Sequence, residues 1–254
     1  MPALTRAAFK DHFSGHAADY AHARPSYPAA LFEFLANHCL RHCVAWDCAT
    51  GNGQAAVALA GYFDQVIATD ASAQQIASAT RHPAIDYRIV PAEASGLPPE
   101  SVDLVTVAQA LHWFDFDRFF AEVERVLVPG GVFAAWCYGL ARVTPACDRI
   151  IDAMYEGLAD YWFPERVHVE SGYRDIQMPF VPLKAPAFEM RLDWTAEQML
   201  AYVRTWSAAK NYQRKHGRDS IDDRAGELRE AWGPGLRPVI WPLAVRAGHC
   251  VLPD

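Results

Sequence analysis

Two acids and two glycines stand close together early in the chain. Asp47 ends an apolar run, and Gly51 and Gly53 follow in the segment Ala-Thr-Gly-Asn-Gly. A second apolar run, Val-Ile-Ala-Thr, ends at Asp70. This order predicts a strand, a tight loop, a helix and a second strand with an acid at its tip. Glycines let a backbone approach a ligand closely, and an acid in this place accepts hydrogen bonds from ribose hydroxyls. The segment could therefore hold a cofactor that carries adenosine.

Other small or polar residues come directly after later apolar runs. Ala92 and Glu93 follow a short run at 86–90, and Gln109 follows a continuous run at 102–108. Runs of this kind are typical of buried strands, and helical segments separate most of them. Strands and helices alternate five times in the first part of the chain, which predicts a parallel sheet with helices on both faces. Ligands of such sheets bind beyond the carboxyl ends of the strands, so we expect all these candidates at one edge.

The composition is that of a globular protein without a nucleic-acid partner. The chain has 254 residues, of which 52% are hydrophobic and 21% charged. This suffices for one large domain, or one domain with an insertion, and excludes a disordered chain. The formal net charge is −7, whereas nucleic-acid binders are usually basic or carry a basic stripe. We interpret the basic cluster at 210–218 as a solvated helix end.

The six cysteines are scattered, which is typical of a reducing compartment. We therefore expect no disulfides and a cytoplasmic location. In the segment 38–43, two histidines would share one helix face and two cysteines another, so we expect the end of a helix and no metal site. No run of 18 apolar residues and no apolar signal core occur, so we expect no membrane association.

The chain divides into four predicted regions. An aromatic N-terminal arm or lid at 1–28 precedes a cofactor-binding core at 29–139, because prolines 25 and 28 interrupt any helix there. The pattern then changes to a helical lid at 140–215, which would hold the acceptor region and an edge strand at about 187–194. In this lid, Thr195 is the predicted cap of a helix through about Lys210. The region 216–254 would add a helix at 222–232 and a final strand that completes the core sheet.

Five segments match, in order, the motifs of a known family. They are Asp47-Cys-Ala-Thr-Gly-Asn-Gly-Gln54, Val66-Ile-Ala-Thr-Asp70, Ala92-Glu93, Val105-Thr-Val-Ala-Gln-Ala-Leu-His-Trp-Phe114 and Leu127-Val-Pro-Gly-Gly131. The chain resembles the class I methyltransferases that use S-adenosylmethionine (SAM), and among them the small-molecule branch typified by trans-aconitate methyltransferase. The resemblance implies a Rossmann-like α/β fold with a seven-stranded, mostly parallel, doubly wound sheet. One departure is Ala49, where the family often has glycine; alanine would be strained if this position needed a positive φ.

The resemblance also implies which residues contact SAM. Asp70 would accept hydrogen bonds from the ribose hydroxyls, and the backbone of Gly51 and Gly53 would border the methionine part. Gln109 would lie near the methyl group, and Ala92 and Glu93 beside the adenine. The expected cofactor-binding residues are Tyr20, Arg24, Asp47, Ala49, Gly51, Gly53, Asp70, Ala71, Ala92, Glu93 and Gln109.

The expected acceptor is a small molecule, such as an organic acid, that is methylated at a carboxylate or hydroxyl oxygen. Its pocket is predicted to include Tyr27, Trp113, Phe114, Trp206 and Tyr212. His112 is the candidate general base, which a hydroxyl acceptor would use and an ionised carboxylate would not need. The alternative for His112 and the aromatic residues is plain packing in the core or the pocket wall. Either a monomer or a homodimer is compatible with the sequence.

Two other functions share the opening motif. A non-catalytic SAM-binding regulator would carry the same loop. A nicotinamide-dependent oxidoreductase would carry a similar one, because Gly51, Gly53 and Ala56 match most of its fingerprint. The sequence has no Tyr-x-x-x-Lys pair and does have the Pro-Gly-Gly stop before the fifth strand, and both features favour a methyltransferase.

Overall fold

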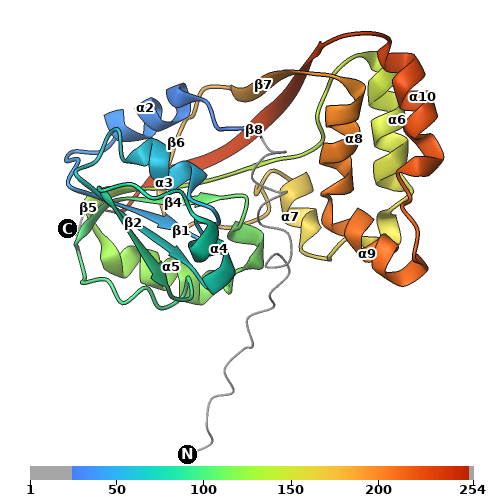
Figure 1. The fold of residues 1–254 in the computed structure, drawn as a ribbon. Coiled ribbons are helices and arrows are strands. Elements are labelled where there is room, and N and C mark those ends of the chain that lie inside the picture. The colour runs from blue at the N-terminus through green and yellow to red at the C-terminus, as the bar shows by residue number, and fades with distance from the viewer. Residues whose placement is uncertain (1–24, 252–254) are drawn as a thin grey trace, which may run out of the picture.

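The computed structural model describes residues 25–251 and shows an α/β fold around one twisted sheet (Figure 1). Within these residues the strand order is β3-β2-β1-β4-β5-β8-β6, and β7 pairs with β8 beside β6. The strands are β1 (Val44–Cys48), β2 (Gln65–Asp70), β3 (Ile85–Ile89), β4 (Val102–Ala108), β5 (Leu127–Tyr138), β6 (Val181–Leu183), β7 (Phe188–Trp194) and β8 (Arg237–His249).

The first five strands run parallel, and β8 is antiparallel to each of its three neighbours. This arrangement confirms the predicted mostly parallel, doubly wound sheet. The described residues hold eight strands where seven were predicted, because the short segment at 181–183 pairs with the end of β8.

Helices cover the sheet and build a second part beside it. They are α2 (Ala29–Asn37), α3 (Gln54–Leu59), α4 (Ala73–Ser78), α5 (Phe116–Val126), α6 (Pro145–Glu156), α7 (Arg166–Glu170), α8 (Ala196–Arg204), α9 (Ser207–His216) and α10 (Asp222–Trp232), with short 3-10 helices at Leu111–Trp113 and Ala159–Tyr161. Side-chain caps start several of them: the Ser72 hydroxyl accepts from the Gln75 amide, and Thr195 forms a capping box with Gln198.

Successive strand residues alternate between two hydrophobic cores, as the period of a strand requires. In β5, Ala134 and Trp136 point into the core shared with α2 and α3, whereas Phe133 and Ala135 point into the core shared with α5. The strands are apolar on both faces because both faces are covered, and this explains the continuous apolar runs in the sequence.

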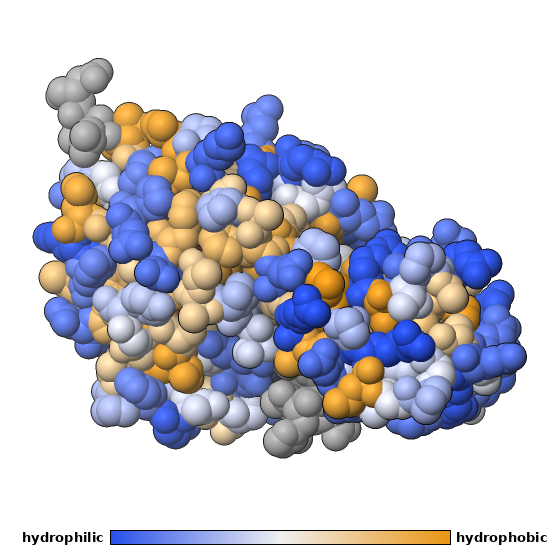
Figure 2. Space-filling view, turned by 90° about the horizontal axis from the view of Figure 1, so that it is seen from above, coloured by the Kyte–Doolittle hydropathy of each residue, from blue (hydrophilic) through white to orange (hydrophobic). Residues whose placement is uncertain are grey.

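The helices α6, α8, α9 and α10 stand at one end of the sheet, and the long strand β8 connects the two parts (Figure 1). Their buried side chains belong to the same core as α2 and α3, so the helical part is packed onto the sheet part without a break. Seen from above, the larger lobe holds the sheet and the smaller lobe the helices, where deep-blue hydrophilic residues are frequent on this face (Figure 2).

The predicted single helix from Thr195 to about Lys210 is two helices. The first ends at Arg204 and the second begins at Ser207, because Trp206 takes a non-helical backbone (φ −59°, ψ 137°). Most of the predicted arm, with Tyr20 and Arg24, lies outside the described residues.

Candidate active site

The glycine loop and Asp70 form a closed unit at the carboxyl ends of β1 and β2. One carboxylate oxygen of Asp70 accepts from the Gly51 amide at 2.9 Å, and the other accepts from the Ser72 amide at 2.8 Å. The Thr50 amide donates to the Thr69 carbonyl, which fixes the loop against β2. The acid therefore holds the loop in place. It also directs two oxygen atoms toward the edge where strand ends meet.

Asp47 lies beneath this loop and does not face solvent. It is 1% exposed, and its oxygens accept from the hydroxyls of Thr50 at 2.5 Å and Thr106 at 2.8 Å. Burial raises the pKa of the Asp47 carboxyl to about 6, although both hydroxyl bonds oppose the shift. Asp47 thus joins the loop to β4.

Three residues of the loop need the left-handed backbone region. Ala49 has φ 53°, Gly51 has φ 57° and Gly53 has φ 87°. A Cβ added to Gly53 would collide with the Tyr87 hydroxyl, so this position excludes a side chain on steric grounds as well. At Ala49 the positive φ makes the departure from glycine a strained one.

The expected adenine side lies after β3. Ala92 is buried, and the Glu93 carboxylate accepts from the Asp115 amide at 3.2 Å. Glu93 therefore ties this loop to the start of α5. Ala71 separates Asp70 from the helix cap Ser72 and is partly exposed.

Gln109 connects the cofactor edge with the neighbouring pocket. It sits at the end of β4 with φ 57°, an uncommon conformation for a residue with a side chain. Its side-chain amide donates to the Tyr138 carbonyl and accepts from the Tyr138 amide, both at 3.2 Å. These two hydrogen bonds hold the carboxyl ends of β4 and β5 together, and we call the pair the Gln109 clamp. Strained residues of this kind are often found at functional sites.

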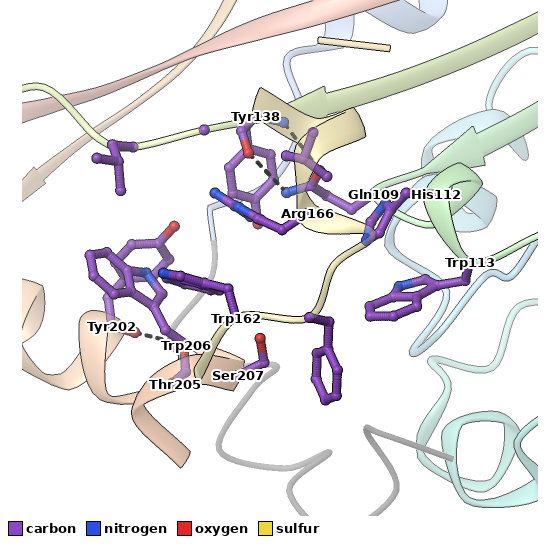
Figure 3. Close-up of a pocket in the computed structure, with 14 residues that line it drawn as sticks. Gln109, His112, Trp113, Tyr138, Trp162, Arg166, Tyr202, Thr205, Trp206 and Ser207 are labelled. Carbon is purple, nitrogen blue, oxygen red and sulfur yellow. Dashed lines mark hydrogen bonds between the residues drawn. The ribbon is translucent and has the colours of Figure 1, made fainter. Parts of the chain in front are cut away.

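A pocket with an empty volume of about 730 Å³ opens next to this clamp, between the sheet and the helical part (Figure 3). Its walls are mainly aromatic. The lining residues are Gln109, His112, Trp113, Tyr138, Gly139, Leu140, Trp162, Phe163, Arg166, Val169, Tyr202, Thr205, Trp206 and Ser207. The turn between α8 and α9 supplies two of them and the first residue of α9 a third, so the helix break that the sequence pattern missed brings this segment to the pocket.

His112 lines the pocket as a neutral ring. Its Nδ1 lies 3.0 Å from the hydroxyl of Tyr173, which is fully buried. The Tyr173 hydroxyl can donate to Nδ1 of the neutral tautomer that carries its proton on Nε2. Burial, with smaller contributions from the nearby Arg166 and His168, lowers the pKa of His112 to about 3. Such a ring is a weak proton acceptor, and the role of His112 as general base stays a prediction.

Arg166, which the sequence did not single out, brings a positive charge into the pocket. Its guanidinium carbon lies 4.9 Å from the centre of the Trp162 ring and 5.5 Å from that of Tyr155. Its Nε donates to the Tyr155 hydroxyl at 3.1 Å, and that hydroxyl donates to Glu170. Figure 3 shows Arg166 between Trp162 on one side and Tyr138 with Gln109 on the other.

The structure brings some of the predicted acceptor residues together and places others elsewhere. Trp113 and Trp206 line the pocket. Tyr27 packs against Trp136 at 5.4 Å, and Phe114 against Phe119 at 4.6 Å. Tyr212 stacks near His216 at 4.4 Å, on the last turn of α9. These three aromatic residues contribute to packing and do not line the pocket.

Residues 25–251 contain neither a metal-ligand cluster nor a membrane-spanning helix. In that part of the chain, no group of three histidine, cysteine or acidic residues could hold a metal ion. No helix there has both the length and the apolar content that are needed to cross a membrane. The six cysteines are free thiols.

Known proteins are similar to this chain in sequence and in fold. The model of the methyltransferase domain family matches residues 46–135, which contain the glycine loop, Asp70 and Gln109. A Dictyostelium discoideum protein, named as a methyltransferase without a stated acceptor, is 33% identical over 236 residues, or 91% of this chain and 90% of that protein. The chain belongs to the class I methyltransferase family.

Two further relatives resemble this methyltransferase over different lengths. A solved structure from Anaeromyxobacter dehalogenans, classed as a type II methyltransferase, is 48% identical with a TM-score of 0.85, covering 91% of this methyltransferase and 99% of that chain. A Saccharomyces cerevisiae protein named as a SAM-dependent methyltransferase is 35% identical over 130 residues, which are 48% of this methyltransferase and 45% of the yeast protein. The family implies SAM as the methyl donor.

Proposed function

We propose that this methyltransferase transfers a methyl group from SAM to an oxygen of a small-molecule acceptor, as in the branch typified by trans-aconitate methyltransferase. The observation that carries the proposal is the position of Gln109. It ends β4 at the edge where the glycine loop and Asp70 lie, and it also lines the aromatic pocket. A donor at the strand ends and an acceptor in the pocket would thus meet at one residue.

The residues at the strand ends suit the chemistry of SAM. Asp70 would accept from the ribose hydroxyls, because a carboxylate oxygen can accept more than one hydrogen bond. The bare backbone at Gly51 and Gly53 would border the methionine part, and the Tyr87 hydroxyl lies where a Cβ of Gly53 would be. Ala92 and Glu93 would lie beside the adenine. When bound, SAM supplies a methyl group on a sulfonium that is already a good leaving group.

The protein's own contribution would be orientation and exclusion of water. In a methyl transfer of this kind, much of the acceleration can come from holding two partners aligned in a dry site. Trp113 and Phe163 pack edge to face at 5.5 Å, and Trp162 and Trp206 lie 5.8 Å apart, so two pairs of rings wall the pocket. A pocket with aromatic walls suits a small molecule, and the net charge of −7 is unfavourable for a nucleic acid.

A ligand comparison tests the proposal directly. Thermal unfolding would be followed with SAM, its demethylated product S-adenosylhomocysteine, and the two nicotinamide dinucleotides. We expect stabilisation by the first two compounds alone; stabilisation by a nicotinamide dinucleotide instead would favour an oxidoreductase. Label from methyl-labelled SAM would then be traced into a panel of small oxygen acceptors. Binding of SAM without transfer to any acceptor in a metabolite extract would favour a regulatory protein.

A further inference from the structure

The electrostatics of the pocket point to the chemical class of the acceptor, and this inference rests on the proposed function. The lining residues include one arginine and no aspartate or glutamate. Among residues 25–251, no carboxylate forms an ion pair with Arg166. The nearby acid Glu170 is bonded to the Tyr155 hydroxyl and not to the guanidinium. The pocket thus presents a positive charge whose ionic partner is not supplied by this part of the chain.

The guanidinium is also held in a defined orientation. Trp162 and Tyr155 both contact its face, and the bond from Nε to the Tyr155 hydroxyl fixes its rotation. Cation–π contacts of this kind stabilise the charge but leave the terminal N–H groups for another partner. No hydrogen bond from those terminal groups is found among the described residues, and Figure 3 shows the group directed into the pocket. A planar pair of N–H donors matches a carboxylate.

His112 adds a second donor on the sheet side of the pocket. In the tautomer in which Tyr173 donates to Nδ1, the Nε2–H of the neutral ring is available to an acceptor oxygen. The groups on α7 that disfavour protonation of this ring are Arg166 and His168. A neutral ring donates a hydrogen bond but hardly removes a proton, which suits an acceptor that is already ionised.

We propose that the acceptor is an aromatic carboxylate, whose carboxylate is held by Arg166 and His112 and whose ring lies among the tryptophans. A lone pair of the carboxylate oxygen would form the O–CH3 bond while the C–S bond breaks and its electrons stay on sulfur. The products are a methyl ester and a neutral thioether, and no proton is released. A base is therefore not needed at the site.

Matched probes separate this acceptor from its neutral analogues. Benzoate and 2-naphthoate would be compared with their amides, primary alcohols and primary amines by calorimetry on the protein saturated with S-adenosylhomocysteine. We expect at least one acid to bind about tenfold or more tightly than its neutral analogues, and the amines not to bind, because the pocket charge repels them. Methyl-labelled SAM should then give the labelled ester of that acid.

Variants of Arg166 test the residue itself. Arg166→Met should weaken binding of the acid on the order of 30-fold and leave any binding of the amide within about twofold. Arg166→Lys, which keeps the charge but loses the planar fork, should give an intermediate loss. Arg174→Ala is the matched control, because Arg174 is an exposed arginine near Tyr173 that does not line the pocket. Thermal unfolding of each variant shows whether it is folded.

The outcomes are distinct for the two proposals. Failure of the protein to bind S-adenosylhomocysteine would contradict the proposed function itself. If the protein binds that compound, four results would each overturn the carboxylate proposal alone. Two concern binding to the wild type: equal affinity for acid and amide, or no binding of either acid. The other two are methyl transfer to the alcohols and an equal loss of acid and amide binding in Arg166→Met.

Discussion

The glycine-loop edge and the acceptor pocket lie side by side but are built in different ways. The edge comes from one stretch of chain between β1 and the loop after β3, and it uses backbone amides, positive φ angles and one acid. The pocket is lined by side chains from Gln109 to Ser207, which the helical part brings together. A site made of local backbone follows from a short motif, whereas a site made of distant side chains depends on tertiary packing.

The same contrast applies to the buried ionisable group at each place. Burial raises the pKa of Asp47 to about 6 beneath the loop and lowers the pKa of His112 to about 3 in the pocket. In both cases the low-dielectric surroundings favour the neutral form. The two groups therefore change stability with pH in opposite directions, which gives an experimental handle on each region separately.

The largest expected effect is on the cofactor edge. Asp70→Ala removes both the proposed ribose acceptor and the bond to the Gly51 amide. We expect S-adenosylhomocysteine to bind about 100-fold or more weakly, as for loss of charge-assisted hydrogen bonds. Calorimetry measures this, with Asp64→Ala as control, because Asp64 is an exposed acid next to the opposite end of β2. Undiminished affinity would show that the cofactor is held elsewhere.

The elements predicted from sequence follow this division between local and distant structure. The strand at 102–108 and the helix at 222–232 have the predicted bounds, and Thr195 starts its helix with a capping box, because each depends on residues close in sequence. The break before Trp206 was missed because nothing local to the 195–210 pattern forbids a continuous helix.

Arg166 in the pocket and Tyr173, which contacts His112, were missed for the same reason. They come from the segment after β5, whose pattern of prolines and short helices does not indicate where it packs. Trp113 follows β4 directly, so its place near the strand ends was predictable. Trp206 lies in the turn before α9 and lines the pocket, whereas Tyr212 lies on α9 and does not. This difference depends on the direction of each side chain, which only the packed structure gives.

Gly53→Ala should show how strictly the edge depends on its backbone. The new Cβ would meet the Tyr87 hydroxyl and would force alanine to adopt φ near 87°. We expect a loss of about 2–4 kcal/mol in the free energy of unfolding, from backbone strain and overpacking together. Chemical denaturation measures it, and Gly53→Ala combined with Tyr87→Phe should recover part of the loss. A loss that the second substitution leaves unchanged would assign the whole effect to backbone strain.

The free energy of unfolding should decrease as the pH falls, because His112 in the pocket is neutral in the folded protein. His112 has a folded-state pKa of about 3 and an ordinary value of 6.5, so the unfolded chain takes up the proton first. The stabilisation is complete above pH 6.5 and is lost as the pH decreases toward 3. Between pH 7 and pH 5 this amounts to about 2 kcal/mol. Denaturation of the wild type and His112→Asn at both pH values isolates this contribution; a constant difference between them would contradict a buried neutral ring.

Asp47 beneath the loop should raise the free energy of unfolding as the pH falls, by less than His112 lowers it. Asp47 has a folded-state pKa of about 6 against an ordinary value of 3.8, so the folded protein binds the proton first as the pH falls. Stability from this group therefore rises between pH 7 and pH 5, by about 1 kcal/mol. In Asp47→Asn this rise should be absent. Loss of a carboxylate oxygen as hydrogen-bond acceptor changes the free energy of unfolding at neutral pH but not its dependence on pH. Parallel pH profiles for the wild type and the variant would mean that the carboxyl is ionised throughout.

The smallest effect is expected at Ala49, where the loop departs from glycine. Its φ of 53° is one that a side chain disfavours, so Ala49→Gly should relieve strain. Glycine also gives the unfolded chain more freedom, and the net gain should be about 0.5–1 kcal/mol. Ala60→Gly is the matched control, because Ala60 has φ −62° at the end of α3 and should lose stability on the same change. If both substitutions lower the free energy of unfolding equally, the positive φ at residue 49 is not a source of strain. If Ala49→Gly raises it and Ala60→Gly lowers it, the loop keeps a strained alanine in a backbone conformation that glycine adopts freely.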